Sequence, residues 1–235
     1  MKIIVMGDLH SEFGRLNQFV NKKKPGIILQ CGDFGWWPHY HMVERISKNH
    51  FYDQYAIKLD GAKLYWADGN HENHDDLRDR MKVAPGQPLD IPVPGCRYMP
   101  RGSVLTLPDG RNVLFFGGAR SIDKHQRVEG ESWWAGEIPT QKDLNFAKKQ
   151  VAAHGGRVDI VISHTAPMLI TMGIPGLALE RTADPTTYML NQILEEFQPK
   201  QWFFGHFHKP LEGRTLGCHW RGLGTVGGTG WVVEI

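Results

Sequence analysis

Short segments of the chain end in side chains that bind metal ions well. In chain order they are Asp8-Leu9-His10, Gly32-Asp33, Gly69-Asn70-His71, His164 and Gly205-His206-Phe207-His208. Carboxylate and amide oxygens together with imidazole nitrogens suit Mn, Fe or Zn better than Mg alone. The candidate metal ligands are Asp8, His10, Asp33, Asn70, His164, His206 and His208.

The donors are numerous enough for two ions. Asp8 and His10 are two residues apart, so in an extended segment both side chains point the same way and can reach one ion. Asp33 has two carboxylate oxygens and can bridge two ions, which a histidine cannot do. Two divalent ions about 3.5–4 Å apart lower the pKa of a bridging water and hold the oxygens of an in-line displacement. That chemistry suits attack on phosphorus.

His71 follows a candidate ligand directly, but we expect its side chain to point away from the ions. A histidine beside a dinuclear site can donate a proton to a leaving alkoxide. An acidic neighbour would keep it charged, and the sequence offers Asp33, Glu72 and Asp75 without ranking them.

Each metal-binding segment follows a β-branched or aromatic run that is typical of a buried strand. The expected strands are residues 2–7, 27–31, 63–67, 158–163 and 202–204. Residues 11–21 have apolar side chains at helical spacing, so the chain begins with a β-α-β unit, which predicts a parallel pair with a right-handed crossover. The carboxyl ends of such strands usually carry the ligand-binding loops.

Other segments complete an α/β pattern. Further helices are expected near residues 41–49, over 140–153, where Thr140 and Asp143 form a capping box, and over 186–197. Strands over 103–107 and 111–117 flank Pro108-Asp109-Gly110, a hairpin signal. The proline-rich residues 85–100 are expected to form a connector, and the glycine-rich residues 214–235 a small antiparallel sheet. We expect one domain over residues 1–235, with two mixed sheets face to face and helices outside.

Composition limits the partners. The 235 residues are 41% hydrophobic and 22% charged, with a formal net charge of +2. This near balance gives no whole-molecule electrostatic basis for binding DNA, RNA or a membrane. Three cysteines without a CxxC spacing predict a reducing compartment. No signal peptide is recognisable, and no apolar run approaches the ~20 residues that span a bilayer, so we expect a cytoplasmic protein.

The ordered segments resemble the signature of the calcineurin-like metallophosphoesterase superfamily, D-x-H, G-D, G-N-H-[ED], H and G-H-x-H, over nearly the whole chain. The resemblance implies a four-layered αββα fold and two divalent metal ions, with Mn²⁺ expected and Fe, Zn or Ni as alternatives. It implies a metal-bound hydroxide nucleophile, no covalent enzyme intermediate, and His71 as proton donor. One ion would be bound by Asp8, His10, Asp33 and His208, and the other by Asp33, Asn70, His164 and His206.

The chain departs from the protein Ser/Thr phosphatases of this superfamily. Their second motif continues G-D-x-V-D-R-G, whereas here residues 34–38 read Phe-Gly-Trp-Trp-Pro, and the arginine that would grip a phosphoprotein is absent from its place. This departure favours phosphodiesters, including cyclic nucleotides or nucleotide-like compounds, over phosphoproteins. A phosphomonoesterase or protein phosphatase, a nuclease, and a non-catalytic scaffold on the same fold remain as alternatives.

A segment between residues 117 and 134 interleaves cations with aromatic side chains. Arg120, Lys124 and Arg127 are candidates for holding a substrate phosphate, and tryptophans 36, 37, 133 and 134 for stacking a ring. The expected partner is a small phosphate ester. The neutral overall charge and the lack of a capping domain argue against long duplex nucleic acid. The oligomeric state stays open.

Overall fold

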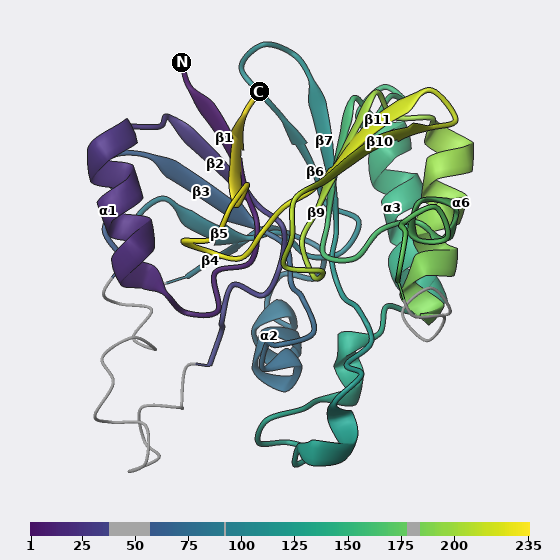
Figure 1. Cartoon of the computed structure of the whole chain (residues 1–235), viewed down its shortest axis with the longest axis horizontal. Helices are drawn as coiled ribbons and strands as arrows, with labels where there is room; N and C mark the ends of the chain where they lie inside the picture. Colours follow the sequence, from purple (N-terminus) through teal and green to yellow (C-terminus); the bar gives the residue numbers. More distant parts are fainter. Residues whose placement is uncertain (38–56, 92, 178–183) are drawn as a thin grey trace.

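Two six-stranded sheets pack face to face in the computed structural model, which describes residues 1–37, 57–91, 93–177 and 184–235 (Figure 1). The helix expected near residues 41–49, and with it His39 and His41, lies outside the described residues. In the first sheet the strand order is β12-β1-β2-β3-β5-β4, and in the second it is β10-β11-β9-β8-β7-β6.

The first sheet is built on the predicted β-α-β unit. Strands β1 (Ile3–Met6), β2 (Ile27–Gln30) and β3 (Lys63–Trp66) are parallel, as expected from their continuous apolar runs. The sheet is completed by β5 (Cys96–Tyr98), parallel to β3, and by the antiparallel strands β4 (Leu89–Asp90) and β12 (Val232–Glu234).

The second sheet has a parallel centre and antiparallel edges. Its parallel strands are β7 (Asn112–Phe116), β8 (Ile160–Ser163), β9 (Gln201–Phe204) and β11 (Cys218–Gly222). Its antiparallel edge strands are β6 (Val104–Thr106) and β10 (Leu211–Thr215). The β6–β7 pair confirms the predicted hairpin.

Helices cover both outer faces. Helix α1 (Phe13–Lys23) lies on one side of the molecule, and α3 (Gln141–Ala153) and α6 (Pro185–Phe197) lie on the other (Figure 1). The shorter elements are α2 (His74–Met81), α4 (Met168–Thr171) and the 3₁₀ turns η4 (Lys124–Gln126) and η5 (Ala135–Glu137). The predicted capping box begins α3. This arrangement confirms the expected αββα layers.

The core consists of three apolar layers. The middle layer joins the facing sides of the two sheets, for example Val5 and Leu29 with Phe115 and Ile162. The outer layers pack α1 against the first sheet, and α3 and α6 against the second. The strands are therefore buried on both faces, which holds their carboxyl ends in fixed positions.

Two expectations about irregular segments were wrong. Residues 85–100 are not only a connector, because β4 and β5 form within them; the three residues of β5 contain no proline and can pair fully with β3. The tail does not form a separate small sheet. Strand β11 pairs with β9 and strand β12 with β1, so the tail extends both main sheets.

Candidate metal centre

All seven predicted ligands lie on loops that follow the carboxyl ends of parallel strands. Asp8 follows β1, Asp33 follows β2 and Asn70 follows β3. From the second sheet, His164 follows β8 directly, while His206 and His208 follow β9. Because the two sheets face each other, loops separated by about two hundred residues of sequence meet at one site.

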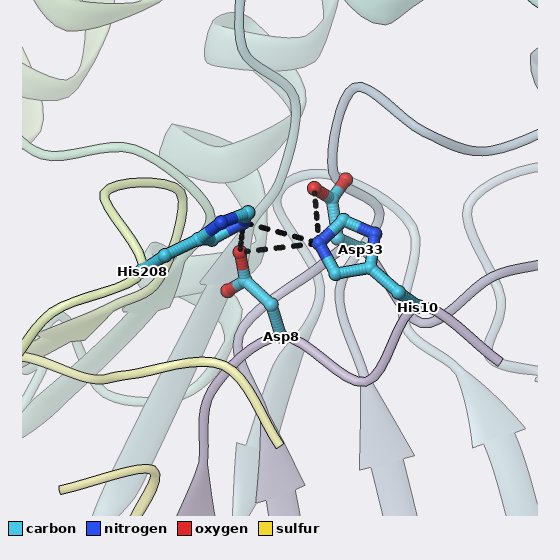
Figure 2. Close-up of side chains that lie close together, drawn as sticks. All are labelled: Asp8, His10, Asp33 and His208. Carbon is cyan, nitrogen blue, oxygen red and sulfur yellow. Dashed lines mark hydrogen bonds and ion pairs between the residues drawn. The ribbon is translucent and has the colours of Figure 1, made fainter. Parts of the chain in front are cut away.

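Four of these residues form a first set of donors. Asp8, His10, Asp33 and His208 each offer one ligand atom, and these atoms all lie within 4.8 Å of one another. Figure 2 shows the side chains pointing toward a common centre. The His208 Nε2 lies 2.9 Å from Asp8 Oδ2, and the His10 Nε2 lies 3.1 Å from His208 Nε2 and 3.6 Å from Asp33 Oδ2.

The remaining ligands form a second set with Asp33. The His164 Nε2 lies 3.0 Å from Asn70 Oδ1 and 3.3 Å from Asp33 Oδ2. The His206 Nδ1 lies 3.1 Å from Asn70 Oδ1 and 3.2 Å from His164 Nε2. The two sets are the ones that the sequence resemblance implied.

The two oxygens of Asp33 have different partners. Its Oδ2 faces His10 in one set and His164 in the other, so a single oxygen is shared between the sets. Its Oδ1 accepts the backbone N–H of His71 at 2.9 Å. Burial alone raises the pKa of Asp33, but the neighbouring imidazoles, His164 first and then His71 and His10, hold that pKa well below its usual value. The carboxylate therefore stays ionised.

The surroundings of these side chains fit divalent ions. The His164 Nδ1 donates its proton to the Cys31 carbonyl at 2.9 Å, so Nε2 is the nitrogen that faces the second set and would bind an ion. The backbone N–H of His206 donates to both oxygens of Asp8 at 3.1 Å. Both aspartates and His164 are buried. Buried carboxylates and imidazoles whose lone pairs converge are the donor set that Mn, Fe or Zn prefers.

The ligand loops have unusual backbone geometry. His10, Asp33, His206 and His208 have positive φ values of 44°, 50°, 63° and 55°. Non-glycine residues adopt such angles rarely, and they gather at functional sites where the fold imposes them. The segment Asp8-Leu9-His10 is therefore not extended throughout as expected, because His10 itself has a left-handed φ.

Two glycines permit the close approach. A Cβ on Gly205 would overlap Asp8 Oδ1, and a Cβ on Gly69 would overlap Asp33 Oδ1. Each glycine precedes a candidate ligand, so any larger residue there would push a carboxylate out of its set.

Ser121 and Glu137 support Asn70, and the sequence did not identify their role. The Asn70 Nδ2 donates to Ser121 Oγ at 3.0 Å, and that hydroxyl donates to Glu137 Oε2 at 2.6 Å. The Glu137 Oε1 also accepts the backbone N–H of Ser121 at 2.9 Å. These hydrogen bonds fix the Asn70 amide so that its oxygen faces the second set. The sequence signal was weak, because Ser121 lies within the cationic segment and Glu137 some distance beyond it.

His71 lies beside the sets and contacts Arg127. The His71 Nε2 is 3.3 Å from Arg127 Nη2, and Asp123 Oδ2 binds the same guanidinium group at 2.7 Å. Burial lowers the pKa of His71, the Arg127 charge lowers it further, and Asp33 opposes both.

Of the three acidic candidates for charging His71, Asp33 is the one that acts on it. Glu72 instead accepts the backbone N–H groups of Gly35 and Gly69. Asp75 pairs with Arg78. Burial, Arg127 and the imidazoles of His10 and His164 together outweigh Asp33, and the expectation that an acidic neighbour keeps His71 charged stays a prediction.

The predicted phosphate-binding cations are dispersed. Of the three, only Arg127 contacts a residue of the site. Lys124 is exposed, with its Nζ 5.6 Å from the centre of the Trp133 ring. Arg120 is exposed, and its backbone N–H donates to Asp184. Among the candidate stacking residues, Trp36 is fully buried in the core.

A pocket of about 280 Å³ opens over the two sets. It is lined by Asp33, Asn70, His71, Ile122, Asp123, His206, Phe207 and His208. The sequence did not single out Ile122, Asp123 or Phe207 as lining residues. They give the pocket an apolar rim and one additional carboxylate.

One family model and several solved structures are similar to this chain. A family model described as calcineurin-like phosphoesterase matches residues 1–210. No curated protein matches the sequence significantly. One solved structure is similar over 95% of this chain and 90% of its own, with 13% identity and a TM-score of 0.55. Another, GAP50 of Plasmodium, described as the anchor in the inner membrane complex, is similar over 95% and 71%, with 12% identity and a TM-score of 0.52.

A third solved structure is the calcineurin-like phosphoesterase YfkN from Bacillus subtilis, which is 13% identical over 100% of this chain and 84% of its own, with a TM-score of 0.45.

None of the helices in the described part of the chain is long and apolar enough to cross a membrane. With its ordered motifs, its αββα layers and the family match over most of its length, the chain belongs to the calcineurin-like phosphoesterase family and is a metal-dependent phosphoesterase.

Proposed function

We propose that the protein hydrolyses small phosphodiesters, including cyclic nucleotides or nucleotide-like compounds, with His71 as the proton donor. The observation that carries the diester preference is the lining of the metal pocket. Among the described residues no lysine or arginine lines it, and the rim contains Asp123 together with the apolar side chains of Ile122 and Phe207.

Charge favours a diester in this pocket. A phosphomonoester carries up to two negative charges near neutral pH, whereas a diester carries one and has a second organic substituent. The Asp123 carboxylate repels the extra charge, and its pairing with Arg127 keeps that cation from acting alone. Ile122 and Phe207 offer apolar surface to an organic group.

The chain's own residues position the reaction. When bound, two divalent ions would supply Lewis acids for the phosphoryl oxygens and would lower the pKa of the attacking water. In this proposal Asp33 Oδ2 holds the two ligand sets at a fixed separation. Asp8, His10 and His208 complete one set, and Asn70, His164 and His206 complete the other. The His164 bond to Cys31 and the Asn70 bond to Ser121 keep those donors oriented.

His71 acts on the leaving group in this scheme. Its ring lines the pocket, and its Nε2 is the atom that would transfer a proton to the leaving oxygen. In the structure the Arg127 guanidinium is hydrogen-bonded to that nitrogen. His71 must therefore release Arg127 and take up a proton before it can donate to the substrate. We propose that Arg127, still paired with Asp123, then contacts a phosphoryl oxygen, so the contact adds no net positive charge to the pocket.

A matched pair of esters tests the substrate class. We expect the Mn²⁺-loaded protein to hydrolyse bis(p-nitrophenyl) phosphate with a kcat/KM at least about tenfold above that for p-nitrophenyl phosphate, a difference of about 1.4 kcal/mol. Cyclic nucleotides extend the panel. Hydrolysis of the monoester alone, with every diester untouched, would refute the diester proposal while leaving the phosphoesterase assignment intact.

Mn²⁺ is the ion that we propose, with Fe, Zn or Ni as alternatives. The mixture of carboxylate, amide and imidazole donors supports a borderline to hard divalent ion. Elemental analysis of the purified protein, followed by reconstitution with each metal, decides among them.

The setting of the enzyme is also part of the proposal. Cys31, Cys96 and Cys218 are free and buried, which supports a reducing compartment such as the cytoplasm. The apolar layer shared by both sheets supports a single domain over residues 1–235.

A non-catalytic scaffold is the second candidate function, because the fold is similar to that of GAP50, which is described as an anchor. The retained donor sets favour hydrolysis over this alternative. A protein that binds two ions but hydrolyses neither ester would support the scaffold.

A further inference from the structure

The loop that joins β11 to β12, residues 224–231, lies against the first metal-binding segment of the chain. The family match ends at residue 210, so this loop lies beyond the matched residues. The sequence predicted only a glycine-rich part of a small sheet there, and the proposed reaction does not use it. Its contacts nevertheless converge on the segments that carry Asp8 and His208, two donors of the first set.

The loop holds the backbone of Asp8. The Val226 N–H donates to the Asp8 carbonyl at 2.8 Å, and the Thr225 hydroxyl donates to the same oxygen at 3.4 Å. One residue earlier in the chain, the Gly7 N–H donates to the Trp231 carbonyl at 2.8 Å. Asp8 is fully buried, and buried backbone groups are almost always paired. These bonds therefore fix the point from which the Asp8 carboxylate reaches the site.

The end of the same loop packs against the segment that carries His208. Gly230 has a φ of 64°, and a Cβ at this position would lie 2.7 Å from the Cβ of Pro210, two residues beyond His208. Glycine tolerates both the angle and the close approach. The loop thus touches the neighbourhood of both Asp8 and His208, whose Oδ2 and Nε2 atoms are 2.9 Å apart (Figure 2).

Helix α1 supports the loop from the other side. The Trp231 ring packs edge-on against the Phe19 ring, with 5.2 Å between the centroids. Gly227 approaches the Arg15 guanidinium, where a Cβ would lie 2.6 Å from Nη1. Val226 and Trp231 also pack against the apolar layer between α1 and the first sheet. The position of the loop is therefore fixed by the fold and passed on to Asp8.

The second set has supports of its own. His164 is bonded to the Cys31 carbonyl, and Asn70 is bonded to Ser121. Among the residues that the structure describes, no hydrogen bond joins the β11–β12 loop to Asn70 or His164. A displacement of the loop should therefore be felt mainly by the first set.

We propose that the β11–β12 loop is a positioning element for one of the two metal sites, the one formed by Asp8, His10, Asp33 and His208. It holds Asp8 and His208 at the separation that one ion requires, and it leaves the other site to its own supports. Because this role concerns metal affinity, it is tested without any hydrolysis and is independent of the diester preference.

A matched pair of glycine substitutions tests this role. Gly230→Ala adds a Cβ that meets Pro210, whereas Gly217→Ala, at the β10–β11 turn, has a φ of 79° and nothing within 4 Å apart from its chain neighbours. Both variants put alanine into a left-handed conformation, but only Gly230→Ala displaces the loop. We expect Mn²⁺ titration calorimetry on Gly230→Ala to show one affinity lowered by at least about tenfold and the other changed by less than about threefold. In Gly217→Ala both affinities should equal those of the parent chain.

Two backgrounds identify the affected ion. His206→Ala leaves the first set complete, and His208→Ala leaves the second set complete. Adding Gly230→Ala should weaken Mn²⁺ binding at least about tenfold in the His206→Ala background and leave it nearly unchanged in the His208→Ala background. Equal weakening in both backgrounds would mean that the loop only stabilises the fold, and no weakening in the His206→Ala background would mean that it positions nothing. Either result overturns the proposal.

A milder variant covers the case in which Gly230→Ala does not fold, as judged by circular dichroism. Thr225→Val removes the hydroxyl that donates to the Asp8 carbonyl and keeps the shape of the side chain. It should weaken Mn²⁺ binding about threefold in the His206→Ala background only, as expected for the loss of one hydrogen bond. An unchanged affinity in that background would also overturn the proposal.

Discussion

The Oδ1 of Asp33 accepts the backbone N–H of His71 at 2.9 Å, while the Oδ2 of the same carboxylate lies between the two ligand sets. One side chain thus positions the shared donor of the metal centre and the loop that carries the proposed proton donor. This geometry makes Asp33 the residue whose loss should be felt at both ions.

Asp33→Asn tests the shared donor. Asparagine keeps an oxygen for the His71 N–H but loses the negative charge between the sets. We expect Mn²⁺ titration by calorimetry to show at least about a 10²-fold loss of affinity at both sites, the upper end expected when a metal ligand or its support is removed. His208→Ala, which belongs to one set, should lower the stoichiometry from two ions to one. Two intact sites in Asp33→Asn would contradict the shared role.

His71→Ala separates catalysis from metal binding. The variant should keep both ions and lose turnover by about 10²-fold or more, because a positioned proton donor contributes that much to the rate. Elemental analysis and steady-state kinetics on the same sample measure both quantities. Full activity in this variant would remove His71 from the mechanism.

Glu137→Gln tests the orientation of Asn70. The Glu137 carboxylate accepts the Ser121 hydroxyl proton, whereas the amide of the variant would donate to Ser121 Oγ. The hydroxyl proton would then compete with Asn70 Nδ2, so the Asn70 oxygen would no longer be held toward the second set. We expect about a 10–100-fold loss of affinity at one ion only. Glu129→Gln, an exposed change nearby in sequence, is the matched control. Equal losses of metal affinity in both variants would show that the hydrogen bonds from Glu137 through Ser121 do not orient Asn70.

Metal ions should stabilise the fold. Asp8 and Asp33 bring two buried carboxylates together, and ions that bind only the folded chain stabilise it by about 2.7 kcal/mol at one hundred times Kd. The Tm should therefore rise with added Mn²⁺ and fall with a chelator, as followed by scanning calorimetry. The same titration on Asp33→Asn should leave the Tm almost unchanged, and an equal rise there would mean that the ions bind elsewhere.

The ion pair between Arg101 and Asp68 should be important for stability. Asp68 is fully buried and bonded to the largely buried guanidinium of Arg101, so Arg101→Ala leaves a buried carboxylate without its cation. We expect urea unfolding to show a loss of about 3–5 kcal/mol in the free energy of unfolding. Arg97→Ala removes the exposed pair with Asp90 and should cost well under about 1 kcal/mol. Similar losses in the two variants would show that burial is not the cause.

The sequence by itself determined the local features and the chemistry. Strand-forming runs before each motif, the Thr140 capping box and the Pro108–Gly110 hairpin turn are set by neighbouring residues, and all three were predicted. The ligand types were equally legible, because aspartate, asparagine and histidine at strand ends have few structural reasons to occur together in that order. The family match over residues 1–210 agrees with this.

Only the tertiary structure decided which atoms meet. Strand β12 pairs with β1 across nearly the whole chain, and no local pattern encodes such a pairing. The sharing of one Asp33 oxygen, the left-handed turn at His10, the Ser121–Glu137 support and the contact of residues 224–231 with Asp8 depend on how separate loops pack. The sequence specifies which side chains are present, but the distances between those side chains follow from the long-range packing of the two sheets. That packing is why the reaction class could be predicted while the supporting residues could not.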